Sequence, residues 1–269
     1  MIPAASGRRA IACVMACLLA AAASAAEPSS SAPPAPKTTW KKATTKAQPP
    51  ATPPASAFDT RRVAPGFAGL KAQDRVAVMP PDIELFSLSV GGVSEPRADW
   101  TAAAREHVKT ALAQRTRTLG LAADFFDERQ ADEFAEPIGL QNAVASAIWV
   151  HHAGQRTLPL PTKHEQLDWS LGDSARPIAQ QTGHRYGLFV FMRDSYASAE
   201  RKAAMIGLAL FGVGALMTGS QVGYASLVDL ESGQVVWFNP LVRMTGDLRE
   251  IDSATETVAE LLGNLPVAP

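Results

Sequence analysis

Apolar positions in residues 57–269 switch between two spacings, and the switching predicts strands that alternate with helices. Short apolar runs over Arg75–Met79, Ile83–Val90 and Leu121–Phe126 predict strands; Pro80-Pro81 ends the first and Gly91-Gly92 the second. Between the second and third runs, apolar residues recur at helical spacing. We therefore expect a helix that begins at Asp99, whose side chain can cap it, and ends at Gly120; its apolar face holds Trp100, Ala104, Val108, Ala111 and Leu112.

Three further helices are expected. Two cover Gln141–His151 and Ser174–Thr182, the second stopped by Gly183. The last has a capping box at Ser253 and Glu256 and is stopped by Gly263 and Pro266; Ile251, Val258 and Leu262 lie on one face.

The strongest strand pattern is Tyr186–Met192, which is apolar on both faces and therefore predicts a central strand covered by helices. Gln221–Leu230 alternates with period two, and after a tight turn Val235–Phe238 returns as a hairpin partner. Pro240 limits that strand and indicates an edge position. The fold class is therefore α/β: a mixed β-sheet with helices packed on it, a C-terminal hairpin and a closing helix.

One segment breaks this alternation. Residues 195–220 form an insertion between two strands, and 203–217 within it have no polar side chain. As a helix this run would be about 22 Å long, short of the ~30 Å hydrocarbon core of a bilayer. Three interpretations stay open: a buried core helix or crossover, an exposed interaction element, or partial membrane insertion. The candidate interaction or membrane-contact residues are Met205, Ile206, Leu208, Leu210, Phe211, Val213, Leu216 and Met217.

The N-terminal 26 residues have the pattern of a secretory signal peptide. Arg8 and Arg9 precede an uncharged stretch over Ala10–Ala23, and small residues follow as a cleavage site near Ala26. Val14-Met15-Ala16-Cys17 also resembles a lipobox, so Cys17 is a candidate lipidation residue. Cleavage near Ala26, which we favour, would remove Cys13 and Cys17, the only cysteines, and exclude disulfide and thiol chemistry.

Charge separates the next segment from the rest of the chain. Residues 27–56 contain eight prolines and a net charge of +3, which predicts a disordered Pro/Ala/Lys-rich tether. Residues 57–269 carry a net charge of −6 and have the size of a single α/β domain. The formal charge of the whole chain is −1, so a strongly basic nucleic-acid binder is excluded.

The search for catalytic motifs finds no nucleophile elbow, phosphate loop or dinucleotide fingerprint. His151, His164 and Asp168 could form a metal site, and Asp194 with Ser195 could line a cleft at the end of the central strand. Solvated loop side chains are the better interpretation of the first group, and no base is paired with Ser195 in the sequence. We expect no enzyme, no metal and no cofactor.

Two stretches carry a family resemblance. Tyr186-Gly-Leu-Phe-Val-Phe-Met-Arg-Asp194 and Gly223-Tyr-Ala-Ser-Leu-Val-Asp-Leu-Glu-Ser-Gly-Gln-Val-Val-Trp237 resemble the core of the TolB N-terminal-domain-like, CsgG-like envelope lipoprotein superfamily, which includes PelC. Val76-Ala-Val-Met-Pro80 fits its opening strand, and the resemblance covers about 75–263. It implies a periplasmic, non-enzymatic module, often oligomeric, that assembles or supports an envelope complex.

The expected function is therefore that of an exported assembly or secretion-accessory protein of a Gram-negative envelope. It would be periplasmic or associated with the outer membrane. Its partner would be another envelope protein or a second copy, reached through the sheet edge and 203–217, or the membrane surface. The alternative is a periplasmic domain that binds a glycan or small ligand at the end of the central strand. A hydrolase using Asp194, Ser195 or the loop histidines is a third interpretation.

Overall fold

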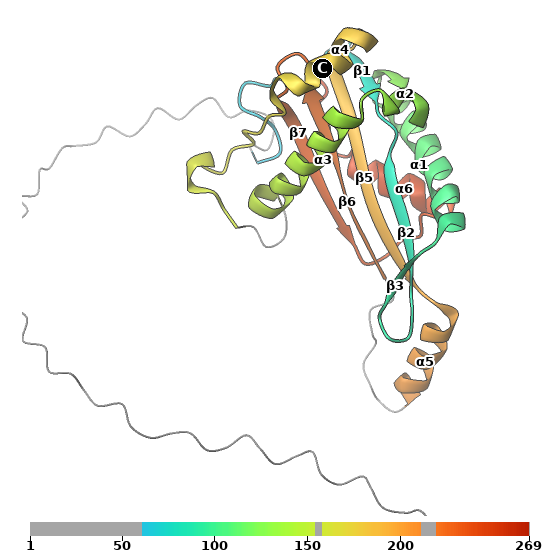
Figure 1. Cartoon of the computed structure of the whole chain (residues 1–269). Helices are drawn as coiled ribbons and strands as arrows, with labels where there is room; N and C mark the ends of the chain where they lie inside the picture. Colours follow the sequence, from blue (N-terminus) through green and yellow to red (C-terminus); the bar gives the residue numbers. More distant parts are fainter. Residues whose placement is uncertain (1–60, 154–157, 211–218, 269) are drawn as a thin grey trace, which may run out of the picture. The chain divides into compact units, whose positions relative to one another are not determined.

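A computed structural model describes residues 61–153, 158–210 and 219–268, apart from the side chains of 207–210. These residues form one seven-stranded mixed sheet with helices on both faces, so the predicted fold class is confirmed (Figure 1). The strands are β1 (Arg75–Val78), β2 (Asp82–Leu88), β3 (Ser94–Pro96), β4 (Ala122–Phe125), β5 (Tyr186–Ala197), β6 (Gly219–Asp229) and β7 (Val235–Arg243).

The central position of β5 is also confirmed. β1 and β2 pair in parallel with successive halves of one edge of β5, from Val76 opposite Tyr186 to Leu88 opposite Ala197. Pro80 and Pro81 separate the two short strands, because proline lacks the N–H that a continuous ladder needs. β6 runs antiparallel along the other edge of β5 and continues into β7.

Each face of the sheet packs on its own set of helices (Figure 1). α1 (Ala98–Thr118) and α6 (Ile251–Leu261) cover one face and share a core with Leu85, Leu188 and Trp237. α3 (Ala135–Ile148) and α4 (Arg176–Thr182) cover the other and pack on Phe189 and Phe238. The short helix α2 (Glu128–Asp132) lies beside α3, and α5 (Ala199–Leu210) follows β5 at the far end of the sheet.

Two predicted helix caps are wrong. Asp99 lies inside the first turn of α1 and pairs with Arg97, which occupies the cap position without a side-chain cap bond. α6 begins at Ile251, so Ser253 also lies within the helix, where its hydroxyl accepts the backbone N–H of Asp247 at 2.6 Å. In both cases a tertiary or neighbouring partner competes with the local cap.

Several predicted boundaries also move. β5 runs to Ala197 and β6 starts at Gly219, so strands occupy both ends of the predicted 195–220 insertion. The helix predicted over Gln141–His151 begins at Ala135 and ends in a π-helical turn, Trp149–Ala153. β7 continues through Pro240. An edge strand tolerates a proline at a position whose N–H would point away from the sheet, because no ladder hydrogen bond is lost there.

Within the described ranges, no helix is long and apolar enough to cross a membrane. The predicted signal peptide 1–26 and tether 27–56 lie outside the described residues, as does Cys17.

Candidate functional site

Two adjoining hollows lie where β2 and β5 end. The larger, about 760 Å³, is bounded by the β2–β3 hairpin, the N-terminal part of α1 and the start of α5. The smaller, about 130 Å³, lies between the ends of β5 and β6 and the loop 244–250 that leads into α6. Both are lined by Ala197, Lys202 and Arg249. Asp194 and Ser195, predicted to line a cleft at the end of the central strand, both line the smaller hollow.

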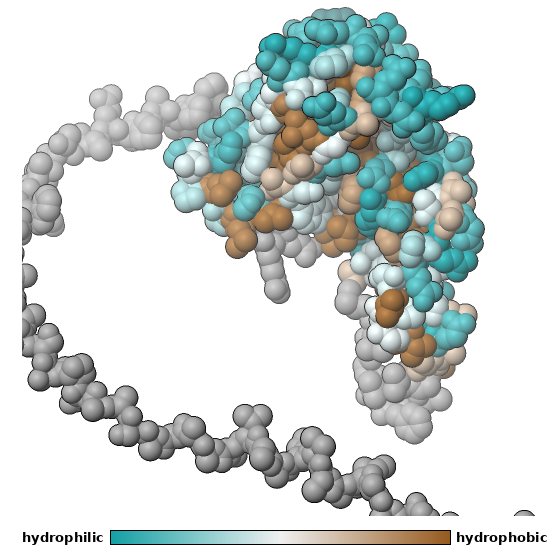
Figure 2. Space-filling view, viewed as in Figure 1, coloured by the Kyte–Doolittle hydropathy of each residue, from teal (hydrophilic) through white to brown (hydrophobic). Residues whose placement is uncertain are grey.

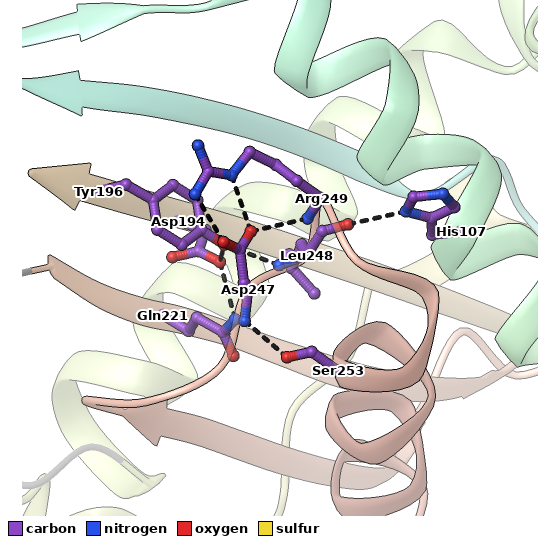
Figure 3. A network of polar contacts seen from close by, with 8 residues as sticks. All are labelled: His107, Asp194, Tyr196, Gln221, Asp247, Leu248, Arg249 and Ser253. Carbon is purple, nitrogen blue, oxygen red and sulfur yellow. Dashed lines mark hydrogen bonds and ion pairs between the residues drawn. The ribbon is translucent and has the colours of Figure 1, made fainter. Parts of the chain in front are cut away.

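A buried network of polar contacts forms one wall of the smaller hollow (Figure 3). The Tyr196 hydroxyl donates a hydrogen bond to the Asp194 carboxylate and accepts one from the Leu248 backbone N–H at 2.7 Å. The Gln221 side-chain amide also donates to Asp194, at 2.8 Å, and its carbonyl accepts from Thr257 of α6 at 3.1 Å. These bonds hold β5, β6, α6 and the 244–250 loop in one arrangement.

Burial dominates the electrostatics of this network. Asp194 is 2% exposed, and its desolvation raises the carboxyl pKa to about 6 against the opposing hydrogen bonds from Tyr196 and Gln221. Burial and the neighbouring Asp194 carboxylate also raise the pKa of Tyr196, so its hydroxyl stays protonated. At neutral pH the network therefore carries a buried negative charge.

Arg249 connects this wall to the larger hollow. Its guanidinium bonds the Asp247 carboxylate through two nitrogens, at 2.8 and 2.5 Å, and lies over the rings of Tyr196 and Trp100. Arg97 also lies over Trp100, 4.4 Å from the ring centroid. From α1, His107 Nδ1 contacts the Leu248 carbonyl at 3.2 Å. The loop is thus fixed by stacking as well as by hydrogen bonds.

Ser195, the candidate nucleophile, has no side-chain partner among the described residues. The Ser195 hydroxyl bonds only backbone groups of Ser220, at 3.3 Å and 3.1 Å, so no side-chain base activates it in the arrangement described.

Two of the three candidate metal ligands contact other groups. His151 contacts the Leu158 carbonyl and stacks on Trp169, while Asp168 pairs with Lys163. His164 has a left-handed backbone at φ 50°. No group of three or more metal-binding side chains occurs within the described ranges.

The predicted interaction residues are described only in part. α5 carries Met205, which is partly buried, and Ile206, which is 67% exposed. Leu208 and Leu210 belong to the backbone of α5, but their side chains lie outside the description, as do Phe211, Val213, Leu216 and Met217 entirely.

The β2–β3 hairpin lies beside α5; the sequence patterns predicted its first strand but missed β3. The Ser198 N–H donates to the Leu88 carbonyl at 2.9 Å, and the Arg201 guanidinium donates to the Ser89 carbonyl at 3.1 Å. Val90 and Val93 at the hairpin tip are 55% and 61% exposed. We call Val90, Val93, Met205 and Ile206 the apolar end; Figure 2 shows apolar side chains reaching the surface there. In the sequence, the only indication of this exposed hairpin tip was the pair of valines that flank Gly91-Gly92.

The sheet edge, also predicted to receive a partner, is partly covered. The outer edge of β7 pairs with residues 62–64: the Phe238 N–H donates to the Arg62 carbonyl, and the Ala64 N–H to the Val236 carbonyl, both at 2.9 Å. Beyond this point Pro240 has no N–H to offer. A strand added to this edge would find only a short free stretch.

Comparison with known proteins gives weak structural likenesses. No family model and no curated protein matches the sequence. A PelC dodecamer structure from Paraburkholderia phytofirmans aligns with a TM-score of 0.37 at 14% identity, covering 75% of this chain and 93% of that one. The C-terminal domain of LpoB from Salmonella enterica gives 0.27 at 13%, covering 68% and 88%. Lipoprotein GNA1162 from Neisseria meningitidis gives 0.28 at 14%, covering 63% and 81%. No superfamily membership follows from likenesses at this level.

Proposed function

We propose that this chain is a non-catalytic envelope protein that supports assembly or secretion by docking a protein partner on its apolar end. The observation that carries the proposal is the exposure of Val90, Val93 and Ile206, which two adjacent elements bring to the same end of the sheet. Each such side chain gains about 1.5–3 kcal/mol when it leaves water completely, so a surface that covers all of them is favoured.

The chemistry around the apolar end favours a protein partner. Glu200, Arg201 and Lys202, in the first turn of α5, place charge of both signs on the helix that carries Met205 and Ile206. An apolar centre with a polar rim is the usual composition of a protein–protein interface. The partner is another envelope protein or a second copy, and the envelope location rests on the signal-peptide pattern and on the family resemblance of the sequence.

Substitution of Ile206 tests the proposal by sedimentation velocity over a range of concentrations, alone and with solubilised envelope extract from the same cells. Ile206→Asp should abolish the concentration-dependent or extract-dependent shift, because a carboxylate cannot be desolvated at an apolar contact. Leu158→Asp is the matched control, since Leu158 is 66% exposed and lies in the loop between the Trp149–Ala153 turn and α4, outside the apolar end. The proposal fails if both variants behave like the wild type, or if both lose association equally.

Membrane binding is the competing result. Vesicles of phosphatidylethanolamine and phosphatidylglycerol are floated on a density gradient with wild-type and Ile206→Asp protein. If wild-type protein floats with the vesicles, the Ile206→Asp protein does not, and no protein complex forms, then the apolar end binds a lipid surface and the proposed protein partner is wrong.

A second function is favoured by one observation, the hollow of about 760 Å³ beside Trp100. Its serine, arginine and glutamate side chains could hydrogen-bond a glycan, as the alternative prediction requires. A melting temperature that rises with peptidoglycan fragments, and no longer rises in Glu95→Ala, would support this function over the first.

A further inference from the structure

The smaller hollow holds a buried charge that the protein itself does not neutralise. Asp194 is 2% exposed, and its described side-chain partners, the Tyr196 hydroxyl and the Gln221 amide, are both neutral. No ion pair to Asp194 occurs among the described residues. Buried carboxylates are normally paired with a cation or a metal, so this arrangement is unusual.

The other charged side chains in the wall do not neutralise the Asp194 carboxylate. The Arg249 guanidinium donates two side-chain hydrogen bonds to the Asp247 carboxylate, and the charges of this pair cancel. Lys202 lines the same hollow from α5, but it is exposed and forms no ion pair with any described residue. Asp194 is thus a buried residue of the hollow's lining, and no described cation lies within ion-pair distance of its carboxylate.

The rest of the lining is mixed. Ser195, Ser220 and Thr245 carry hydroxyl groups, beside the apolar Ala197 and Met244. The volume of this hollow is about 130 Å³. That is room for a charged head group, while the rest of a ligand would lie in the adjoining hollow of about 760 Å³.

We propose that the smaller hollow is a binding site for a primary ammonium or guanidinium group, which pairs with the Asp194 carboxylate. The group belongs either to a free small amine or to a lysine or arginine side chain of a peptide. Lys202 opposes binding, since its ammonium lines the same space. This site is independent of the proposed docking at the apolar end, because an isolated monomer would bind the cation.

Binding depends on pH through the ionisation of Asp194. Burial raises the pKa of this carboxyl to about 6, and a bound cation would lower it again. The charged or titratable groups facing Asp194 are Tyr196 on β5, Asp247 and Arg249 on the loop, Lys202 on α5 and, through the Leu248 carbonyl, His107 on α1. Because only about a tenth of Asp194 is ionised at pH 5, affinity there should be about tenfold lower than at pH 7.5.

An NMR titration of the full chain with methylammonium and methylguanidinium chloride tests the site, using the backbone amides of Ser195 and Gly246 as reporters. Tetramethylammonium and sodium chloride at equal ionic strength are the salt controls. Asp194→Asn should weaken binding at least tenfold without unfolding the protein, since the amide keeps the shape and removes only the charge. Lys202→Met should tighten binding several-fold. The matched variants are Asp173→Asn and Lys71→Met, both at exposed positions remote from this hollow, and they should leave affinity unchanged.

The results separate the sources and can overturn the site. Tighter binding of an acetylated Gly-Lys-Gly or Gly-Arg-Gly amide than of methylammonium assigns the cation to a peptide, whereas equal affinity assigns it to a small amine. The site does not exist if the reporters respond equally to tetramethylammonium or sodium, or if Asp194→Asn binds as the wild type does. A pH dependence that survives in Asp194→Asn and disappears in His107→Asn would also contradict it.

Discussion

At the residue scale, the buried Asp194 makes a prediction about stability. Its folded-state pKa of about 6 lies above the ordinary 3.8, so the folded state holds the proton more tightly than the unfolded state. Stability from this group is fully present below pH 3.8 and is lost as the pH rises through about 6, by on the order of 3 kcal/mol. Asp194→Asn cannot ionise and should not show this loss.

Urea unfolding of both proteins between pH 4.5 and 7.5 measures the effect. The difference in unfolding free energy, variant minus wild type, should increase with pH. A difference that stays constant across this range would mean that Asp194 is not destabilised by its charge.

The Tyr196 hydroxyl donates a hydrogen bond to Asp194, and its removal gives a second prediction about stability. Tyr196→Phe leaves the Leu248 N–H without its acceptor and removes one of the two side-chain donors to the Asp194 carboxylate, and this should cost about 1–3 kcal/mol of unfolding free energy. Tyr186→Phe is the control: Tyr186 is also buried, but its hydroxyl has no hydrogen bond to a described residue. Thermal unfolding at pH 7 should separate the two variants, and equal losses would contradict a special role for Tyr196.

At the element scale, replacing either of two glycines by alanine should change the stability of the protein in opposite directions. A Cβ on Gly223, in the middle of β6, would lie 2.4 Å from the Phe191 carbonyl oxygen, so the β5–β6 ladder must open to admit it. Gly223→Ala should therefore destabilise the protein by more than about 2 kcal/mol. A Cβ on Gly139, in α3, meets nothing within 4 Å, so Gly139→Ala should stabilise by up to about 1 kcal/mol. Chemical denaturation of the two variants gives the comparison, and a stable Gly223→Ala would show that the strands can move apart.

Elements were predictable from the sequence where a local pattern decides them. Tyr186–Met192 identified β5 because both faces are apolar, and the spacing from Trp100 to Leu112 identified α1. The caps at Asp99 and Ser253 were not predictable, because Arg97 and the Asp247 N–H compete for those side chains in the folded chain. β3 is three residues long and pairs only with β2, so it leaves no periodic signal.

The candidate site was predictable at one strand only. The position of Asp194 at the end of β5 indicated a cleft, because the carboxyl ends of parallel strands meet at one edge of the sheet. Gln221 and Asp247 come from distant segments, and no spacing in the sequence connects them to Asp194. Their convergence depends on how β6 and the loop before α6 pack, which is a property of the tertiary structure.

At the scale of the whole molecule, the apolar end and the cation site should respond differently to salt. The apolar end would associate through a hydrophobic contact, which weakens on cooling and is not screened by salt. The cation site would act through a charge pair, and 0.5 M sodium chloride reduces the Debye length to a few ångströms. Sedimentation velocity at 4 and 30 °C, with and without this salt, should therefore show association that is stronger when warm and undiminished by salt. Under the same conditions methylammonium binding should fall, by less than an exposed ion pair would, because the carboxylate is buried. If salt instead dissociates the complex while Ile206→Asp leaves it intact, charged side chains hold the partner, and docking on the apolar end is wrong.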